Sequence, residues 1–238
     1  MELHELAGVP EFVGITVLDT VGLVIPGADS ALLERLAPHN PRGYHALGLI
    51  SSRTGAAGQI TAVDDAIKNT NTELLTFELP RDTKGWGGHG NYIVIGGHDV
   101  SDVRRAVELA LELIRKYAGE VYINEAGHLE CAFSPRAGDA LHRAFDIPLN
   151  QAFGFLAASP AAIGMLMADT SLKSADITLC RYMTPDAGTS HSNEVIVAFT
   201  GDTDAVKTAV LRGREIGLTL LRAMGGEPTG PSVPFLHE

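Results

Sequence analysis

The chain has 238 residues, of which 45% are hydrophobic and 20% charged, and this composition is typical of a globular protein, not a disordered one. Its length suits two domains of ordinary size. The formal net charge of −11 argues against nucleic acid as a partner, because a phosphate backbone would be repelled. No apolar run reaches the roughly 18 residues of a membrane-spanning helix, and the start shows no basic signal-peptide region. We therefore expect no membrane partner and a cytoplasmic location.

Taken in chain order, the sequence of the first half predicts short strands followed by helices. The expected elements are one or two early strands, a short helix around 29–36, strands at 46–50, 74–77 and 92–95, and helices over 60–67 and 103–117. The helix over 60–67 is indicated by Ile60, Val63 and Ile67, which recur on one face. Such interleaved strands and helices predict an α+β domain, an α/β sandwich with helices packed against a sheet.

The second half of the chain repeats the first. Residues 62–74 match residues 167–179, and in this match Asp64 pairs with Asp169 and Lys68 with Lys173. Further along, we align residues 91–95 with 193–197; upstream, more weakly, 22–25 with 127–130 and 30–33 with 139–142. The chain therefore predicts two tandem domains, residues 1–118 and 119–238, joined near 117–120.

The loop before the strand at 92–95 is the most conspicuous segment of the chain. Gly85, Gly87 and Gly90 satisfy the G-x-G-x-x-G pattern, but the loop opens onto a strand instead of a helix, so we reject a dinucleotide site. A hairpin loop is the simpler interpretation; a loop packed closely around a symmetry axis, where only glycine fits, is the alternative. The equivalent loop of the second copy, residues 183–192, is also small and polar and carries His191.

Metal and catalytic patterns are missing from the sequence. Cys131 and Cys180 are the only cysteines and cannot form a four-cysteine site, and we expect two buried thiols. The nine histidines show no H-x-x-x-H or H-E-x-x-H spacing, so we predict no metal and no cofactor. There is no G-x-S-x-G elbow, and although residues 124–130 bring Glu125 near His128, a turn explains them as well as a base. We expect that the protein is not an enzyme. Of the possible functions, a hydrolase or lyase that uses a histidine of either loop is the weakest hypothesis.

The matched strings show a resemblance over essentially the whole chain. Residues 11–14, 19–25, 62–71, 78–90, 96–103, 124–128, 167–169 and 188–194 resemble the trimeric tandem-domain shell proteins of bacterial microcompartments, of the propanediol-utilisation type with circularly permuted domains. The resemblance implies a homotrimer with pseudo-hexameric symmetry and no catalysis. It also implies that this trimer joins hexameric and pentameric shell proteins around enclosed enzymes. A pore would pass small polar metabolites such as diols, amino alcohols and aldehydes.

The resemblance also assigns roles to particular residues. The two loops would line the pore, and the candidates are Arg81, Asp82, Lys84, Gly85, Trp86, Gly87, Gly88, His89, Thr189, Ser190, His191 and Ser192. Lys68 and Lys173 would lie at the edge of the tile and meet neighbouring tiles, although a lysine near a helix C-terminus also suits the helix dipole. Neither loop contains a cysteine, so no iron–sulfur cluster is expected in the pore. A metabolite-binding regulatory trimer is the alternative function.

Overall fold

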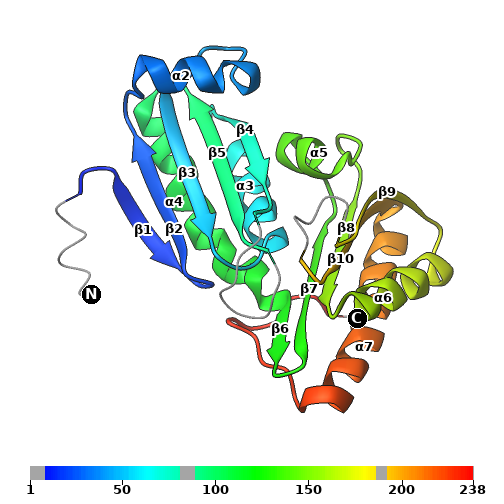
Figure 1. Ribbon diagram of the computed structural model, residues 1–238. Helices are drawn as coiled ribbons and strands as arrows, with labels where there is room; N and C mark the ends of the chain where they lie inside the picture. The colour runs from blue at the N-terminus through cyan, green and yellow to red at the C-terminus, as the bar shows by residue number, and fades with distance from the viewer. Residues whose placement is uncertain (1–8, 81–88, 186–191, 238) are drawn as a thin grey trace.

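The computed structural model describes residues 9–80, 89–185 and 192–237, and it consists of two copies of one five-stranded antiparallel sheet with helices packed against it (Figure 1). The first copy contains β1 (Phe12–Thr16), β2 (Thr20–Ile25), α2 (Ser30–Leu36), the 3-10 helix η1 (Ala37–His39), β3 (Ala46–Ser52), α3 (Ala57–Lys68), β4 (Glu73–Glu78), β5 (Asn91–Gly97) and α4 (Val100–Tyr117). The second contains η2 (Ala118–Glu120), β6 (Val121–Asn124), β7 (Gly127–Ser134), α5 (Asp139–Phe145), β8 (Phe153–Ser159), α6 (Ala161–Ser174), β9 (Ile177–Met183), β10 (Val195–Gly201) and α7 (Thr203–Gly225).

The two sheets have the same topology, which confirms the predicted duplication and α+β fold. Their strand orders are β1-β2-β3-β5-β4 and β6-β7-β8-β10-β9. The registers also agree, since Gly48 of β3 pairs with Ile95 of β5, and Gly154 of β8 pairs with Phe199 of β10. The predicted boundary between residues 118 and 119 falls between the two sets of strands and stays a prediction.

One predicted alignment of the copies is out of register by two residues. Matching residues 91–95 to 193–197 would make Ile95 equivalent to Val197, whereas the strand pairings make it equivalent to Phe199. The alignment rested on a shared asparagine, which is the first residue of β5 in one copy (Asn91) and lies just before β10 in the other (Asn193). A single shared polar residue does not fix the register of a strand made of interchangeable apolar residues.

A second predicted alignment is out of register by four residues. We matched Ile25 to Glu130, but their pairing with neighbouring strands makes Val21 the equivalent of Glu130. The helices α2 and α5 that follow had been aligned correctly, and they require this same register. The difference matters because Glu130 is a buried carboxylate and Val21 is not one.

The largest of the apolar clusters in the described residues runs across both copies of the fold. Helices α3 and α4 pack together behind the first sheet, and α5 of the second copy packs against α3 and β4 (Figure 1). The ring of Phe145 on α5 lies 5.6 Å from that of Phe77 on β4 and 5.3 Å from that of Phe155 on β8, centroid to centroid. Because Phe145 is fully buried and contacts Phe77 of the first copy, within an apolar cluster that includes buried residues of both copies, the copies meet as a protein interior does and not as two separate domains.

The C-terminal segment ties the second copy back to the first. Thr229 pairs with Ile123 of β6, and the ring of Phe235 packs edge-on against Tyr117 of α4 at 5.4 Å. Buried Glu120 accepts hydrogen bonds from the backbone amides of Phe235 and Leu236 at 2.8 and 2.7 Å. The segment therefore closes the same junction that α3 and α5 form.

Candidate functional site

A buried carboxylate joins the two copies at the ends of the predicted pore loops. Glu194 immediately precedes β10 and is fully buried. One of its oxygens bonds His89 Nδ1 from the first copy, and the other lies 2.8 Å from His128 Nε2 of β7. His89 follows the first loop and Glu194 follows the second, so this cluster fixes both loop ends to the same point of the fold.

The charges in this cluster stabilise one another against the cost of burial. Burial alone would lower the pKa of His89, but the adjacent Glu194 carboxylate and its hydrogen bond outweigh burial and raise that pKa. Burial alone would raise the pKa of Glu194, yet the charges of His89 and His128 and their hydrogen bonds hold it well below its usual range. The cluster therefore contains an ionised carboxylate beside a histidine that favours its protonated form.

A small enclosed cavity next to the histidines has room for one water molecule. Its volume is about 10 Å³, and its lining includes His89, His128 and Glu130. Within the described residues, His89 Nε2 and His128 Nδ1 are buried and have no hydrogen-bond partner. A cavity of this volume is too small for a metabolite.

The second polar contact between the copies caps helix α3. The carboxylate of Glu130, on β7, accepts hydrogen bonds from the backbone amides of Ala57 at 2.8 Å, Ala56 at 3.1 Å and Gly58 at 3.2 Å. The first turn of a helix has unpaired amides and a partial positive charge, so a carboxylate from another element satisfies both. Glu130 therefore aligns the first copy on the second.

The third polar contact is made by the helix that the sequence match singled out. Asp64 of α3 is fully buried and accepts hydrogen bonds from the amides of Gly138 at 2.9 Å and Leu141 at 3.2 Å, at the start of α5. Lys68 pairs with Asp64 at 2.7 Å and donates to the carbonyl of Arg136 at 2.7 Å. Lys68 is thus engaged at the junction between the copies.

The equivalent lysine of the second copy has different surroundings. Lys173 of α6 pairs with Asp169 at 2.7 Å, and the two side chains are 74% and 51% exposed. For Lys68 the side-chain exposure is 31%. The two lattice-edge candidates therefore differ: the side chain of Lys173 projects into solvent, and that of Lys68 is less exposed and is held by contacts at the junction.

Most pore candidates lie outside the described residues. Those are Arg81, Asp82, Lys84, Gly85, Trp86, Gly87, Gly88, Thr189, Ser190 and His191. The two candidates that the structure describes, His89 and Ser192, are 2% and 1% exposed in the single chain. The expectation of two buried thiols is confirmed for Cys131 and wrong for Cys180, which is partly exposed; both thiols are free. In the described part of the chain, no group of three or more His, Cys, Asp or Glu residues could hold a metal ion.

Sequence reasoning missed Glu194, Glu130 and the structural role of Asp64. A signal was present for two of them, because Glu194 and Glu130 adjoin or interrupt apolar strands, where an unpaired carboxylate would be costly. For Asp64 the signal was its recurrence as Asp169, but only Lys68 and Lys173 were interpreted.

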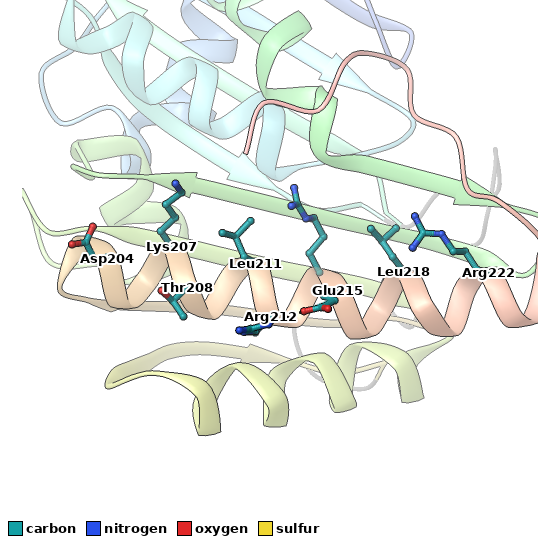
Figure 2. A pocket seen from close by; sticks show the side chains of 9 residues that line it. Asp204, Lys207, Thr208, Leu211, Arg212, Glu215, Leu218 and Arg222 are labelled. Atoms are coloured by element: carbon teal, nitrogen blue, oxygen red, sulfur yellow. Dashed lines mark hydrogen bonds and ion pairs between the residues drawn. The ribbon is translucent and has the colours of Figure 1, made fainter. Parts of the chain in front are cut away.

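A hollow of about 560 Å³ along α7 carries no comparable cluster. Figure 2 shows that its side chains leave two sides of the helix, with Lys207 and Leu211 on one side and Thr208 and Arg212 on the other. Its arginines are paired within the chain: Arg212 with Glu215, Arg214 with Glu120 and Arg222 with Glu227. We assign no ligand to this surface.

Comparisons with known proteins identify the family to which this fold belongs. The model of the BMC domain matches the chain twice, at residues 46–126 and 152–225. The chain belongs to the BMC-domain family of bacterial microcompartment shell proteins. Each match begins at the third strand of its copy, as expected if the order of elements is circularly permuted.

Curated relatives and a solved structure extend the match to nearly the whole chain. The chain is 50% identical over 218 residues to the microcompartment shell protein PduB of Citrobacter freundii, covering 92% of this chain and 80% of that protein. It is 46% identical to PduB of Limosilactobacillus reuteri, covering 95% and 94%. A crystal structure of a trimeric PduB superposes with a TM-score of 0.91 at 45% identity and covers 95% of this chain and 100% of that one.

These findings confirm the predicted resemblance and the structural role in a microcompartment shell. The family accounts for the duplicated fold. The described helices include none that is both long and apolar enough to cross a bilayer.

Proposed function

We propose that three copies of this chain form a flat pseudo-hexameric tile of a microcompartment shell, which acts without catalysing a reaction. The observation that carries this proposal is the junction inside the chain, where α3 of one copy packs against α5 of the next. A contact between two different surfaces of one fold generates a ring when its rotation closes. Three chains would supply six such copies, and the solved relative described as trimeric supports that number.

The tile would carry a central passage for small polar metabolites such as diols, amino alcohols and aldehydes. The residues expected to line it are those of the two loops, 81–88 and 189–191, while His89, Ser192 and Glu194 hold the loop ends. The burial of His89 and Ser192 and the hydrogen bonds of Glu194 support this anchoring role for the residues at the loop ends. Other shell proteins, hexameric and pentameric, and enclosed enzymes would be the further partners.

The mass of the protein in solution tests the tile. Native mass spectrometry at micromolar concentration should give three times the mass of one chain. A stable single chain or dimer would contradict the proposal. Calorimetry with nucleotides and diols is the second measurement, because tight nucleotide binding would favour a metabolite-binding regulatory trimer.

The lattice contact is proposed for Lys173. Its ammonium group is mostly exposed, whereas Lys68 is engaged with Asp64 and the Arg136 carbonyl. Lys173→Glu should leave the trimer intact in native mass spectrometry and reduce two-dimensional arrays in electron microscopy. Lys207→Glu on α7 makes the same charge change elsewhere and serves as the control. Unchanged arrays of the Lys173 variant would contradict the lattice role.

A further inference from the structure

After Thr229 the C-terminal segment lies on the surface of the protein and is buried only near its end. It passes β6 (Figure 1), and its residues 230–234 are exposed or partly buried, with Val233 80% exposed. Leu236, in contrast, is 5% exposed and belongs to the apolar cluster formed with α7. We call residues 230–237 the C-terminal strap. A segment with this pattern of burial resembles a bound peptide more than a part of the core.

The site under the strap binds a peptide backbone through two charged side chains. Oxygen Oε1 of Glu120 accepts the amides of both Phe235 and Leu236. The guanidinium of Arg214 donates to the Leu236 carbonyl at 2.9 Å and pairs with the other Glu120 oxygen at 2.8 Å. Glu120 is fully buried, so its charge requires these partners. Two consecutive amides and one carbonyl of the strap are thereby satisfied at one place.

The same site distinguishes the side chains of these two strap residues. The Phe235 ring packs edge-on against Tyr117, and the Lys116 ammonium nitrogen lies 5.7 Å from the centroid of the Phe235 ring. Both contacts favour an aromatic ring at this position. Leu236 enters the apolar cluster instead, where a polar side chain would be costly to bury. The site therefore selects an aromatic residue followed by an aliphatic one.

Two glycines allow the strap to lie close to the rest of the protein. A Cβ atom on Gly119 would lie 2.0 Å from the Val233 carbonyl oxygen, and one on Gly230 would lie 2.5 Å from the carbonyl oxygen of Val121. Neither glycine has a positive φ, so close approach and not backbone conformation explains both. The two surfaces are therefore matched in shape, with one glycine on each side.

The first copy of the fold lacks this site. The pairings of β1 and β6 with their neighbouring strands put Gly14 in the place of Glu120. When α4 and α7 are aligned at their first buried residue, most of their buried positions coincide, and Leu111 takes the place of Arg214. The fold is therefore complete without the buried carboxylate and its arginine, so the binding of a peptide is what accounts for the two charges.

We propose that Glu120, Arg214 and Tyr117 form a binding site for an extended peptide in which an aromatic residue precedes an aliphatic one. The chain's own Phe235 and Leu236 occupy this site in the structure, so the strap acts as an intramolecular competitor. Among the described residues the strap adds no strand to either sheet, so its release breaks no strand pairing. A partner protein with such a segment would then take its place. This proposal concerns one chain and holds whether or not the tile forms.

Binding of a labelled peptide to the full-length protein tests the site. The probe is a fluorescent peptide with the sequence of residues 228–238, and its binding is measured by anisotropy. The double variant Phe235→Ala/Leu236→Ala frees the site and should bind the probe saturably. Wild type should bind it about tenfold more weakly, because the apparent affinity falls with the fraction of sites that are free. A probe with alanine at both positions is the matched control and should bind neither protein.

A folded double variant that does not bind the probe, or that binds it no better than wild type does, would overturn the proposed site. Circular dichroism of the double variant shows whether it is folded. Binding of the alanine probe as tightly as the native one would overturn the selectivity for an aromatic residue followed by an aliphatic one.

If the double variant fails to fold, hydrogen exchange of the wild-type protein is the second test. The amides of Phe235 and Leu236 should exchange together and faster than the buried amides of α7, because release of the strap is a local opening. Exchange of the strap amides only at the rate of α7 would overturn the proposal, since the strap would then leave its site only when the fold itself opens.

Discussion

Replacing Glu194 by Gln should destabilise the protein by an amount that depends on pH. The amide has nearly the shape of the carboxylate, but it removes the charge that His89 and His128 share. A hydrogen bond to a charged group contributes about 1.5–3 kcal/mol, and breaking a buried ion pair costs about 3–5 kcal/mol when the remaining charge stays buried. We expect a loss within the lower range at high pH and within the upper range at acidic pH.

The sign of the pH dependence follows from the two pKa shifts. His89 has a raised pKa in the folded protein, so its stabilisation is complete below its ordinary value of 6.5 and is lost as the pH rises through the raised value. Glu194 has a lowered pKa, so its stabilisation is complete above its ordinary value of 4.5 and is lost as the pH falls. The difference between wild type and variant should therefore be largest between pH 4.5 and 6.5.

Urea unfolding at pH 5.5 and pH 8.5 measures this difference. Both proteins should be compared at the same chain concentration, because assembly contributes to apparent stability. Glu227→Gln is the control: it removes an exposed carboxylate paired with Arg222 and should change the urea midpoint little at either pH. An equal loss at both pH values, or a larger loss at pH 8.5, would refute the proposed ionic state of the cluster.

Three further changes probe the junction, each measured by the urea midpoint. Glu130→Gln should cost about 1–2 kcal/mol, because an amide caps the first turn of α3 without a charge; an unchanged midpoint would argue against the cap. Gly90→Ala should cost about 1–3 kcal/mol, since a Cβ atom there would lie 2.4 Å from the Ser52 carbonyl oxygen; a neutral effect would mean that the loop end relaxes. Lys68→Glu should destabilise strongly, because it places a second carboxylate beside buried Asp64, while Lys173→Glu should be nearly neutral; equal effects would contradict the difference between the copies.

The sequence predicted the duplicated fold because helices and strands have characteristic periods. Val103, Ala106 and Val107 marked α4 by their helical spacing, and Tyr92–Ile95 marked β5 as one apolar run. Register was harder to predict, because apolar strands of similar composition align equally well at several offsets. Only strand pairing showed that Val21, and not Ile25, is the counterpart of Glu130.

The polar cluster could not be predicted, because its members are distant in sequence. His89 and Glu194 are 105 residues apart, and no sequence pattern around either residue indicates that the two side chains form a hydrogen bond. For residues 124–130 the sequence left two interpretations open, a turn between strands and a catalytic base. In the structure Asn124 donates to the Leu221 carbonyl near the end of α7, and His128 bonds Glu194 in the cluster.

Duplication within one chain explains why the two junctions can differ. In a ring of six identical chains, a carboxylate at the position of Glu130 would occur at every junction and would have to fit all six. In the proposed ring of three tandem chains, Glu130 would occur only inside the chain, because its counterpart in the first copy is Val21. The charged contacts of Glu130 with the start of α3 are thereby confined to the junction that the chain itself holds together, whereas the carboxylate of Asp64 recurs in the second copy as Asp169.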